Sequence, residues 1–345
     1  MKQVTFGRNN GLRVSELCLG TGTFGSTLRP GASLEEARRI VDRYAAAGGT
    51  FVDTASNYQE GESEEFVGEL LASRREQFVL ASKYSRGSGK PGDRLLAGNS
   101  RRSMVRSVEH SLRRLKTDYL DMYWAHYDDR VTPIDEIVGS FDNLIRSGKI
   151  LYGGLSNFPA WRVSRAQTLA EMGRFAPIGG IQVEHSLVER TAERELLPMA
   201  EAFGIGAALY SPLGGGFLTG KHRTGQAGRG VLVYREDTEQ RTAILDRLVE
   251  LSKMLDVSPG VLAIAWQRHL HHRSSSALVT IAGPRTVDQL DDYLHAVDLN
   301  LTADIVDRLN EVSAPALGVP FDSIGGPTDI GDDPERLADR VVPVN

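Results

Sequence analysis

Eight short apolar segments, each followed by a helix-like segment, constrain the fold of this chain more than any other feature. In chain order they are ELCLG, TFVDT, QFVLASK, DYLDMYWAH, ILYGGLSN, GGIQVEH, GIGAALYSP and ALVTIAG. Regular alternation of strand and helix favours an α/β fold with parallel strands joined by right-handed crossovers. Eight such units that close on themselves form a (β/α)8 TIM barrel, for which about 250 residues are typical. The sequence therefore predicts a TIM barrel.

The segments around the barrel also have expected positions. Asn10-Gly11 lies between two short β-type runs, which predicts an N-terminal β-hairpin lid over residues 1–16. The barrel then occupies 17–313 and a C-terminal tail occupies 314–345. We interpret residues 1–345 as one domain, because no linker-like composition marks a boundary. Helices are expected near 63–73, 100–115, 133–148, 160–172, 190–203, 238–255, 259–272 and 286–297, after a first helix capped by Ser33 with Glu36 three residues on.

The chain is longer than a minimal barrel in three places. These are residues 84–99, residues 212–237 and the C-terminal tail. The first two segments are rich in glycine and follow the third and seventh strands. We expect all three to overhang the mouth of the barrel, where the active site lies in this fold.

Composition narrows the classes of function. The 40 basic and 45 acidic residues leave a net charge of −5 with no long basic run, so we expect neither nucleic acid nor a membrane surface as a partner. Cys18 is the only cysteine and lies in an apolar run, which predicts a buried thiol and excludes an intrachain disulfide. No apolar stretch is long enough for a membrane helix and the N-terminus lacks a signal peptide, so a cytoplasmic location is expected.

Two glycine motifs suggest nucleotide folds that the surrounding residues contradict. Gly20, Gly22 and Gly25 match G-x-G-x-x-G, but Pro30 breaks the helix that a dinucleotide fold needs there. The segment 215–221 matches a phosphate loop but lacks the following hydroxyl and helix. Neither motif favours a doubly wound fold.

Four polar residues lie at, or five positions after, the ends of successive strands: Asp53, Tyr58, Lys83 and His126. Parallel strands bring their carboxyl ends to the same edge, so these side chains are expected to converge. Singly, each has a structural explanation such as a helix cap or a solvated strand end. Together, the Lys83 ammonium is expected to lower the pKa of the Tyr58 phenol, and Asp53 to hold that ammonium. His126 is suited to orient a carbonyl group.

Such a site lacks a reductant of its own. The cluster of His269, His271 and His272 does not place three imidazoles on one helix face, so no metal site is predicted. Hydride would therefore have to come from a bound cofactor.

These motifs resemble those of the aldo-keto reductase superfamily from residue 1 to about 315. The segment LGTGTFG at 19–25 is similar to the family's first-strand loop, and Asp53 with Tyr58 matches its DTAxxY signature. The resemblance implies Tyr58 as general acid, Lys83 as the partner that lowers its pKa, Asp53 as the anchor of Lys83 and His126 as the group that orients the substrate.

The resemblance also implies an NADP(H) site. Arg285 would face the 2′-phosphate, Ser156, Asn157 and Gln182 the nicotinamide carboxamide, and Tyr210 the nicotinamide ring. The remaining expected cofactor contacts are Gly22, Thr23, Phe24, Asp53, Ser211, Pro212, Leu213, Gly215, Gly283 and Gln289. The chain departs from the family pattern at Tyr293, where many relatives have asparagine, and at His185, where many have tyrosine.

The implied function is NADPH-dependent reduction of an aldehyde or ketone to an alcohol. Three segments, WAHYDDRVTP, 84–99 and LVERTAERELLPMA, resemble the bacterial aryl-alcohol-dehydrogenase-like branch, which favours aromatic or aliphatic aldehydes. One alternative is reduction of a keto-deoxysugar nucleotide. Another is an NADPH-binding regulatory subunit like the β-subunits of potassium channels. The expected partner is a small carbonyl substrate, and the oligomeric state stays open.

Overall fold

The computed structural model describes residues 1–87, 94–224, 238–271, 274–316 and 318–321. Several sequence-based expectations lie outside the described residues. They concern 88–93 and 225–237 in the two long loops, His272 in the histidine cluster and the tail from residue 322 onward, including its expected place near the mouth.

Eight parallel strands form a closed barrel, as the sequence predicts. The strand order around it is β10-β3-β4-β5-β6-β7-β8-β9, and β9 pairs with β10 to close the ring. Every expected apolar segment supplies one strand. Their bounds are β3 (Leu17–Gly20), β4 (Phe51–Asp53), β5 (Val79–Tyr84), β6 (Leu120–Ala125), β7 (Ile150–Ser156), β8 (Ile178–Glu184), β9 (Gly206–Tyr210) and β10 (Leu278–Ala282).

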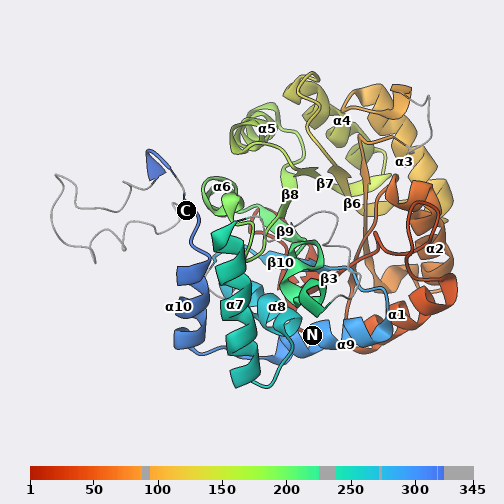
Figure 1. Ribbon diagram of the computed structural model, residues 1–345. Helices are drawn as coiled ribbons and strands as arrows, with labels where there is room; N and C mark the ends of the chain where they lie inside the picture. Colours follow the sequence, from red (N-terminus) through yellow and green to blue (C-terminus); the bar gives the residue numbers. More distant parts are fainter. Residues whose placement is uncertain (88–93, 225–237, 272–273, 317, 322–345) are drawn as a thin grey trace.

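Helices surround the barrel on its outer face (Figure 1). They are α1 (Leu34–Ala46), α2 (Glu62–Leu71), α3 (Arg101–Leu115), α4 (Ile134–Arg146), α5 (Ala160–Gly173), α6 (Leu196–Ala202), α8 (Pro259–His271) and α9 (Val287–Asp298). The helix expected over 190–203 is shorter, because a 3-10 turn (Thr191–Glu193) precedes α6. Within the described residues, no helix has the length and apolar character needed to cross a membrane.

Two further helices, α7 (Glu239–Met254) and α10 (Ala303–Val312), add a layer beside α8. Figure 1 shows α7 and α10 side by side, and Leu248, Leu309 and Trp266 join them to α8 in one buried apolar cluster. Helix α7 agrees with the helix expected over 238–255, whereas no helix was expected at α10. The Trp266 indole also donates a hydrogen bond to Asn310 at 3.0 Å.

The first helix begins where its cap was expected. Ser33 Oγ accepts a hydrogen bond from the backbone N–H of Glu36 at 3.2 Å. The Glu36 carboxylate accepts from the backbone N–H of Val287 at 2.8 Å, in the first turn of α9. Glu36 therefore ties α1 to the start of α9, where a negative charge is favourable.

The N-terminal hairpin closes the amino end of the barrel. Its strands β1 (Gln3–Thr5) and β2 (Arg13–Ser15) are antiparallel, and Phe6 is fully buried among the strands. The Phe6 ring contacts the rings of Phe51 and Trp124 edge to face. A Cβ on Gly206 would lie 2.8 Å from this ring, so glycine is required there for Phe6 to fit. The expected lid is therefore a plug at the end opposite the mouth.

Phe6→Ala should destabilise the protein by about 3–5 kcal/mol, because it empties a fully buried aromatic site among rigid strands. Equilibrium urea unfolding measures this loss. Phe175→Ala is the matched control: Phe175 is 39% exposed, so its truncation should cost less than about 1 kcal/mol. Equal losses for the two variants would contradict the role of Phe6 as a plug.

Candidate active site

A buried ion pair between Asp53 and Lys83 lies at the centre of the site. Asp53 is the last residue of β4 and Lys83 is near the end of the adjacent strand β5. Lys83 is fully buried, and its ammonium donates to Asp53 Oδ2 at 2.5 Å, to the Thr54 carbonyl at 2.7 Å and to the Tyr58 hydroxyl at 3.1 Å. All three N–H groups of the ammonium are thus used, as a buried charge requires.

Electrostatics keep Lys83 charged. Burial alone would lower the pKa of its ammonium, but the neighbouring Asp53 carboxylate and the Tyr58 oxygen outweigh burial and raise that pKa. On the other side, Asp53 Oδ1 accepts from the Gln182 amide of β8 at 3.0 Å. The ion pair is therefore held by Gln182 from across the barrel and by Thr54 and Tyr58 on its own side.

Tyr58 stands just after β4, at the start of a 3-10 turn (Tyr58–Gly61). The next residue, Gln59, has a φ of 50° and is buried. Its amide makes hydrogen bonds at 2.8–3.2 Å with the backbone of Gly25, Leu28 and Arg29. Tyr58 is therefore fixed to the loop after β3 by its neighbour, which explains why an unfavourable φ persists there.

The pKa of Tyr58 is raised above 10, in contrast to the expectation from the sequence. Burial raises the pKa and outweighs the opposing effect of the Lys83 charge, while the Asp53 carboxylate raises it further. The predicted lowering by Lys83 is present, but the prediction of a net lowered pKa is wrong. The phenol therefore keeps its proton throughout the neutral pH range.

His126 follows β6 and completes the group. Its ring meets the Tyr58 ring edge to face, with 6.0 Å between centroids. Burial, followed by the Lys83 and Arg86 charges, lowers the pKa of His126 well below 6.5, so the imidazole is neutral. Its Nδ1 is buried without a hydrogen-bond partner in the part of the chain that the structure describes. Such an atom indicates a site for a polar ligand group.

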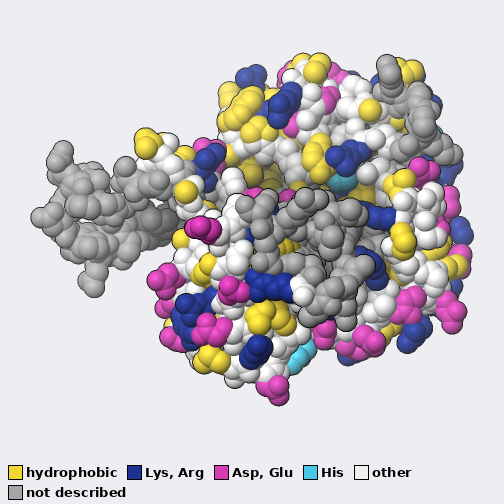
Figure 2. Space-filling view, viewed as in Figure 1, with side chains coloured by type: hydrophobic (Ala, Val, Ile, Leu, Met, Phe, Trp, Pro, Cys, Tyr) yellow, Lys and Arg dark blue, Asp and Glu magenta, His cyan; other side chains and the backbone are white. Residues whose placement is uncertain are grey.

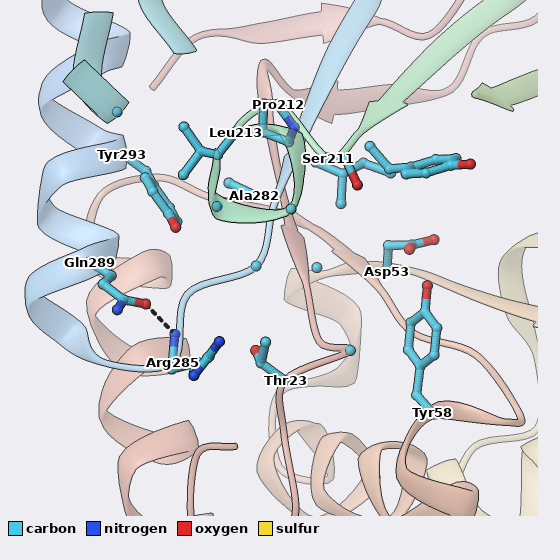
Figure 3. Close-up of a pocket in the computed structure, with 18 of the residues that line it drawn as sticks. Thr23, Asp53, Tyr58, Ser211, Pro212, Leu213, Ala282, Arg285, Gln289 and Tyr293 are labelled. Atoms are coloured by element: carbon cyan, nitrogen blue, oxygen red, sulfur yellow. Dashed lines mark hydrogen bonds between the residues drawn. The ribbon is translucent and has the colours of Figure 1, made fainter. Parts of the chain in front are cut away.

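A cavity of about 750 Å³ extends from Tyr58 and His126 to α9. Figure 3 shows the Tyr58 hydroxyl directed toward Asp53 at one end, with Arg285, Gln289 and Tyr293 at the other. Every predicted cofactor residue lines this cavity except Phe24, Ser156 and Asn157. Three of the four predicted catalytic residues line it, and Lys83 lies behind Tyr58.

The three exceptions lie beneath the cavity wall. Phe24 is fully buried in the core. Ser156 is buried and accepts a hydrogen bond from the Asn157 amide at 3.0 Å. The Asn157 oxygen accepts from the Tyr210 hydroxyl at 2.8 Å, and its amide also donates to the His126 carbonyl. Asn157 thus joins the Tyr210 ring to the strand end that carries His126.

The opposite end of the cavity is formed by the N-termini of α8 and α9. Ser258 caps α8 and Thr286 caps α9, each accepting from a backbone N–H three residues later. The Arg285 N–H donates to the Gln289 side chain at 2.9 Å (Figure 3). Helix N-termini and a guanidinium both favour phosphate groups.

The residues present fit a nicotinamide dinucleotide. Gly22 and Gly283 leave space at the cavity wall: an added Cβ would lie 3.4 Å from the Tyr58 ring and 3.3 Å from the Gly20 carbonyl, respectively. Polar groups at one end, apolar Leu213 between, and two helix N-termini at the other match the parts of such a cofactor. Tyr293 lines the cavity where the sequence departs from the family pattern, and burial raises its pKa to about 12.

The second departure, His185, lies in a buried network away from the cavity. Its Nε2 contacts Glu193 at 2.8 Å and its ring stacks on Trp266. The Gln267 amide donates to its carbonyl at 2.6 Å. Although burial favours the neutral acid, hydrogen bonds from His185 and Arg190 lower the pKa of Glu193 to about 2. His185 therefore joins β8 to α8.

Sequence reasoning missed several residues of the cavity wall. Lys221 lies there, although its motif was set aside as a false phosphate loop. The Ser-Pro-Gly sequence at the start of α8 could have identified this part of the wall, because serine followed by proline is typical of a helix N-terminus. Other lining residues that were not singled out include Leu28, Arg29, Asn57, Gln59, Arg86, Tyr127 and Asp292.

Comparison with known proteins identifies close similarities over most of the chain. The model of the Aldo/keto reductase family matches residues 16–314. An uncharacterized oxidoreductase of Bacillus subtilis, YrpG, is 37% identical over 319 residues, covering 90% of this chain and 95% of that protein. The aryl-alcohol dehydrogenase [NADP(+)] of Phanerodontia chrysosporium is 32% identical over 347 residues, covering 92% and 88%. Norsolorinic acid reductase of Aspergillus flavus is 30% identical over 320 residues, covering 90% and 81%.

Asp53→Asn should destabilise the protein by about 3–5 kcal/mol, because it leaves the Lys83 charge buried without its counter-charge. Urea unfolding at pH 7 measures the change. Glu69→Gln, which breaks the exposed Arg38–Glu69 pair, is the control and should cost less than about 1 kcal/mol. Adding Lys83→Met to Asp53→Asn should restore part of the lost stability. An Asp53→Asn single variant as stable as the wild type would show that Lys83 does not need the Asp53 charge for stability.

Proposed function

The chain belongs to the aldo/keto reductase family, and on that premise we propose that it reduces the carbonyl group of an aldehyde or ketone with NADPH. It is an oxidoreductase, as its family membership shows. The observation that carries the proposal is the hydrogen bond from the buried Lys83 ammonium to the Tyr58 hydroxyl at the cavity wall. Acid chemistry needs a positioned donor, and this contact positions one.

The geometry supports Tyr58 as the proton donor. Because Lys83 donates to the phenol oxygen, the Tyr58 O–H remains available for the oxygen of a carbonyl substrate. The raised pKa keeps that proton in place until the substrate oxygen gains negative charge. The phenolate left behind then faces the Lys83 ammonium, which stabilises it at short range.

His126 is suited to hold the carbonyl oxygen. A neutral imidazole has one N–H donor, and the low pKa of His126 keeps it neutral at physiological pH. The edge-to-face contact with Tyr58 brings both rings to the same side of the cavity. Both groups therefore reach one carbonyl oxygen from different directions, and their hydrogen bonds strengthen as charge develops on it.

The cofactor, when bound, supplies a hydride to the carbonyl carbon. On the side of the protein, Gln182 and Tyr210 line the cavity nearest the ion pair, and Arg285 and Gln289 line its far end. Arg285 supports a choice of NADPH over NADH, since its guanidinium suits the additional phosphate. One relative carries NADP(+) in its name, which agrees with this choice.

Aromatic and aliphatic aldehydes are the first substrates to test. Relatives named aryl-alcohol dehydrogenase and norsolorinic acid reductase support an aromatic carbonyl compound. A panel of aldehydes, ketones and keto-sugars, followed through NADPH absorbance, distinguishes this proposal from keto-sugar reduction. A regulatory subunit would bind NADPH and turn over none of them. The cytoplasmic location remains a prediction from the sequence.

Tyr58→Phe should lower kcat for aldehyde reduction by about 10²–10⁴-fold, because it removes the proton donor and keeps the ring. NADPH affinity, measured by fluorescence titration, should change less than about twofold. Tyr152→Phe, on β7, is the control and should retain full activity. A Tyr58→Phe variant as active as the wild type would remove Tyr58 from the mechanism.

The pH profile gives a second readout for Tyr58. The donor is the neutral phenol, which exists below its pKa, and that pKa is raised. Reduction by the wild type should therefore stay level through the neutral range and fall only above about pH 10. Alcohol oxidation needs the phenolate, so the rate of oxidation should rise above about pH 10, where the rate of reduction falls. A fall in reduction centred near pH 7 to 8 would contradict this assignment.

Arg285→Met should weaken NADPH binding by about 10–100-fold, because a charge-assisted phosphate contact is lost. NADH binding serves as the internal control and should change little. Fluorescence titration with both cofactors measures the ratio. A wild-type protein that binds both cofactors equally would exclude Arg285 as a phosphate ligand.

A further inference from the structure

Arg86 lies at the reacting end of the cavity without an assigned role. It follows Lys83 by three residues and lines the cavity together with His126 and Tyr127. Its guanidinium carbon lies 4.2 Å from the centre of the Tyr127 ring. Within the described ranges, no carboxylate forms an ion pair with Arg86. The cation is therefore held by an aromatic face and keeps its hydrogen-bond donors available.

The backbone that presents Arg86 is anchored on both sides. Ser85 has a φ of 88°, which is unfavourable for a residue with a side chain. Its hydroxyl accepts from the Tyr127 N–H at 3.0 Å, and its carbonyl accepts from the Gly98 N–H at 2.8 Å. These contacts hold Ser85 in this conformation, and they therefore fix the backbone that leads into Arg86.

The Tyr127 platform is fixed as well. Asp129, two residues later, accepts hydrogen bonds from the backbone of Asn99 and from the backbone and hydroxyl of Thr132 at 2.6–2.8 Å. Arg162 of α5, which is buried, pairs with Asp128 at 2.6 Å and donates to the Thr132 carbonyl at 2.7 Å. The loop that carries Tyr127 is thus tied to two neighbouring elements.

Ring contacts connect Arg86 to the proposed reacting groups. The Tyr127 ring lies 4.9 Å from the His126 ring, and His126 contacts Tyr58. The guanidinium is therefore one aromatic ring away from the imidazole. A substrate whose carbonyl group meets Tyr58 and His126 would place its far end toward Arg86, because Tyr127 contacts both His126 and Arg86.

The charges on the cavity wall favour an anion at this end. The two carboxylates among the described lining residues are Asp53 and Asp292. Asp53 is paired with Lys83, and Asp292 lies on α9 at the far end. Figure 2 shows Lys and Arg side chains near the centre of the viewed face. An exposed guanidinium at the cavity wall that has no ion-pair partner among the described residues suits a carboxylate, which it can bind through two parallel hydrogen bonds.

We propose that Arg86 is a specificity-determining residue that binds a carboxylate of the substrate. The preferred substrates are then aromatic aldehydes with a carboxylate on the side of the ring opposite the carbonyl group. The assignment rests on the proposed reductase function, since it names the substrate class of that same site. The Tyr127 ring contacts both Arg86 and His126 and so links the two positions that recognise the substrate.

The test compares 4-formylbenzoate with its methyl ester, which keeps the ring and the aldehyde but removes the charge. The wild type should show a higher kcat/KM for the carboxylate. Arg86→Met should lower kcat/KM for the carboxylate by about 10–100-fold and change the ester by less than about threefold. Arg86→Lys should fall between the two, because an ammonium keeps the charge but loses the paired hydrogen bonds. Arg165→Met, at an exposed position on α5, removes one positive charge and should change neither substrate.

The two proposals fail in different ways. Turnover of the ester by both the wild type and Arg86→Met would support the reductase function independently of the role of Arg86. A wild type that prefers the ester, or an unchanged substrate ratio in Arg86→Met, would overturn the role of Arg86 and leave the reductase standing. No turnover of any carbonyl compound would overturn the reductase.

Calorimetric titration with 4-(hydroxymethyl)benzoate provides a readout that needs no turnover. Arg86→Met should raise the Kd for this carboxylate by about tenfold or more relative to the wild type. The same titration of Arg165→Met should match the wild type. Equal affinities for the wild type and Arg86→Met would overturn the carboxylate site.

Discussion

The buried ion pair between Asp53 and Lys83 is the constraint on which the rest of the site depends. A charge removed from water requires full compensation, and Lys83 obtains it from one carboxylate, one carbonyl and one phenol oxygen. Gln182 fixes the other carboxylate oxygen from the far side of the barrel. Since Tyr58 is one of the three acceptors, its position follows from the need to satisfy a buried ammonium.

The same burial sets the protonation states of the site. It keeps the Tyr58 phenol neutral despite the adjacent charge, and it keeps the His126 imidazole neutral. The charged pair holds its position while the two neutral groups, which line the cavity, retain their protons. Asp53 and Lys83 thus carry the charges, whereas the proton is carried by Tyr58, one hydrogen bond away from Lys83.

The sequence was sufficient for the barrel and for the convergence of Asp53, Tyr58, Lys83 and His126, because parallel strands bring their carboxyl ends to one edge. It was insufficient where the outcome depends on distant neighbours. The net pKa of Tyr58 depends on how much of the fold covers it, and the contact of Arg86 with Tyr127 depends on two separate loops. Helix α10 was missed although its apolar face packs well, and residues 190–203 form two short elements instead of one helix.

The Phe6 plug has a consequence for how this scaffold can change over time. Much of the packing that seals the barrel is concentrated at the amino end, around Phe6, Phe51 and Gly206. Loops at the other end carry the groups that meet small molecules, and their residues contribute little to that seal. Mutations in these loops that alter substrate selectivity can therefore accumulate while the fold stays stable. This makes the chain a tolerant starting point for laboratory evolution.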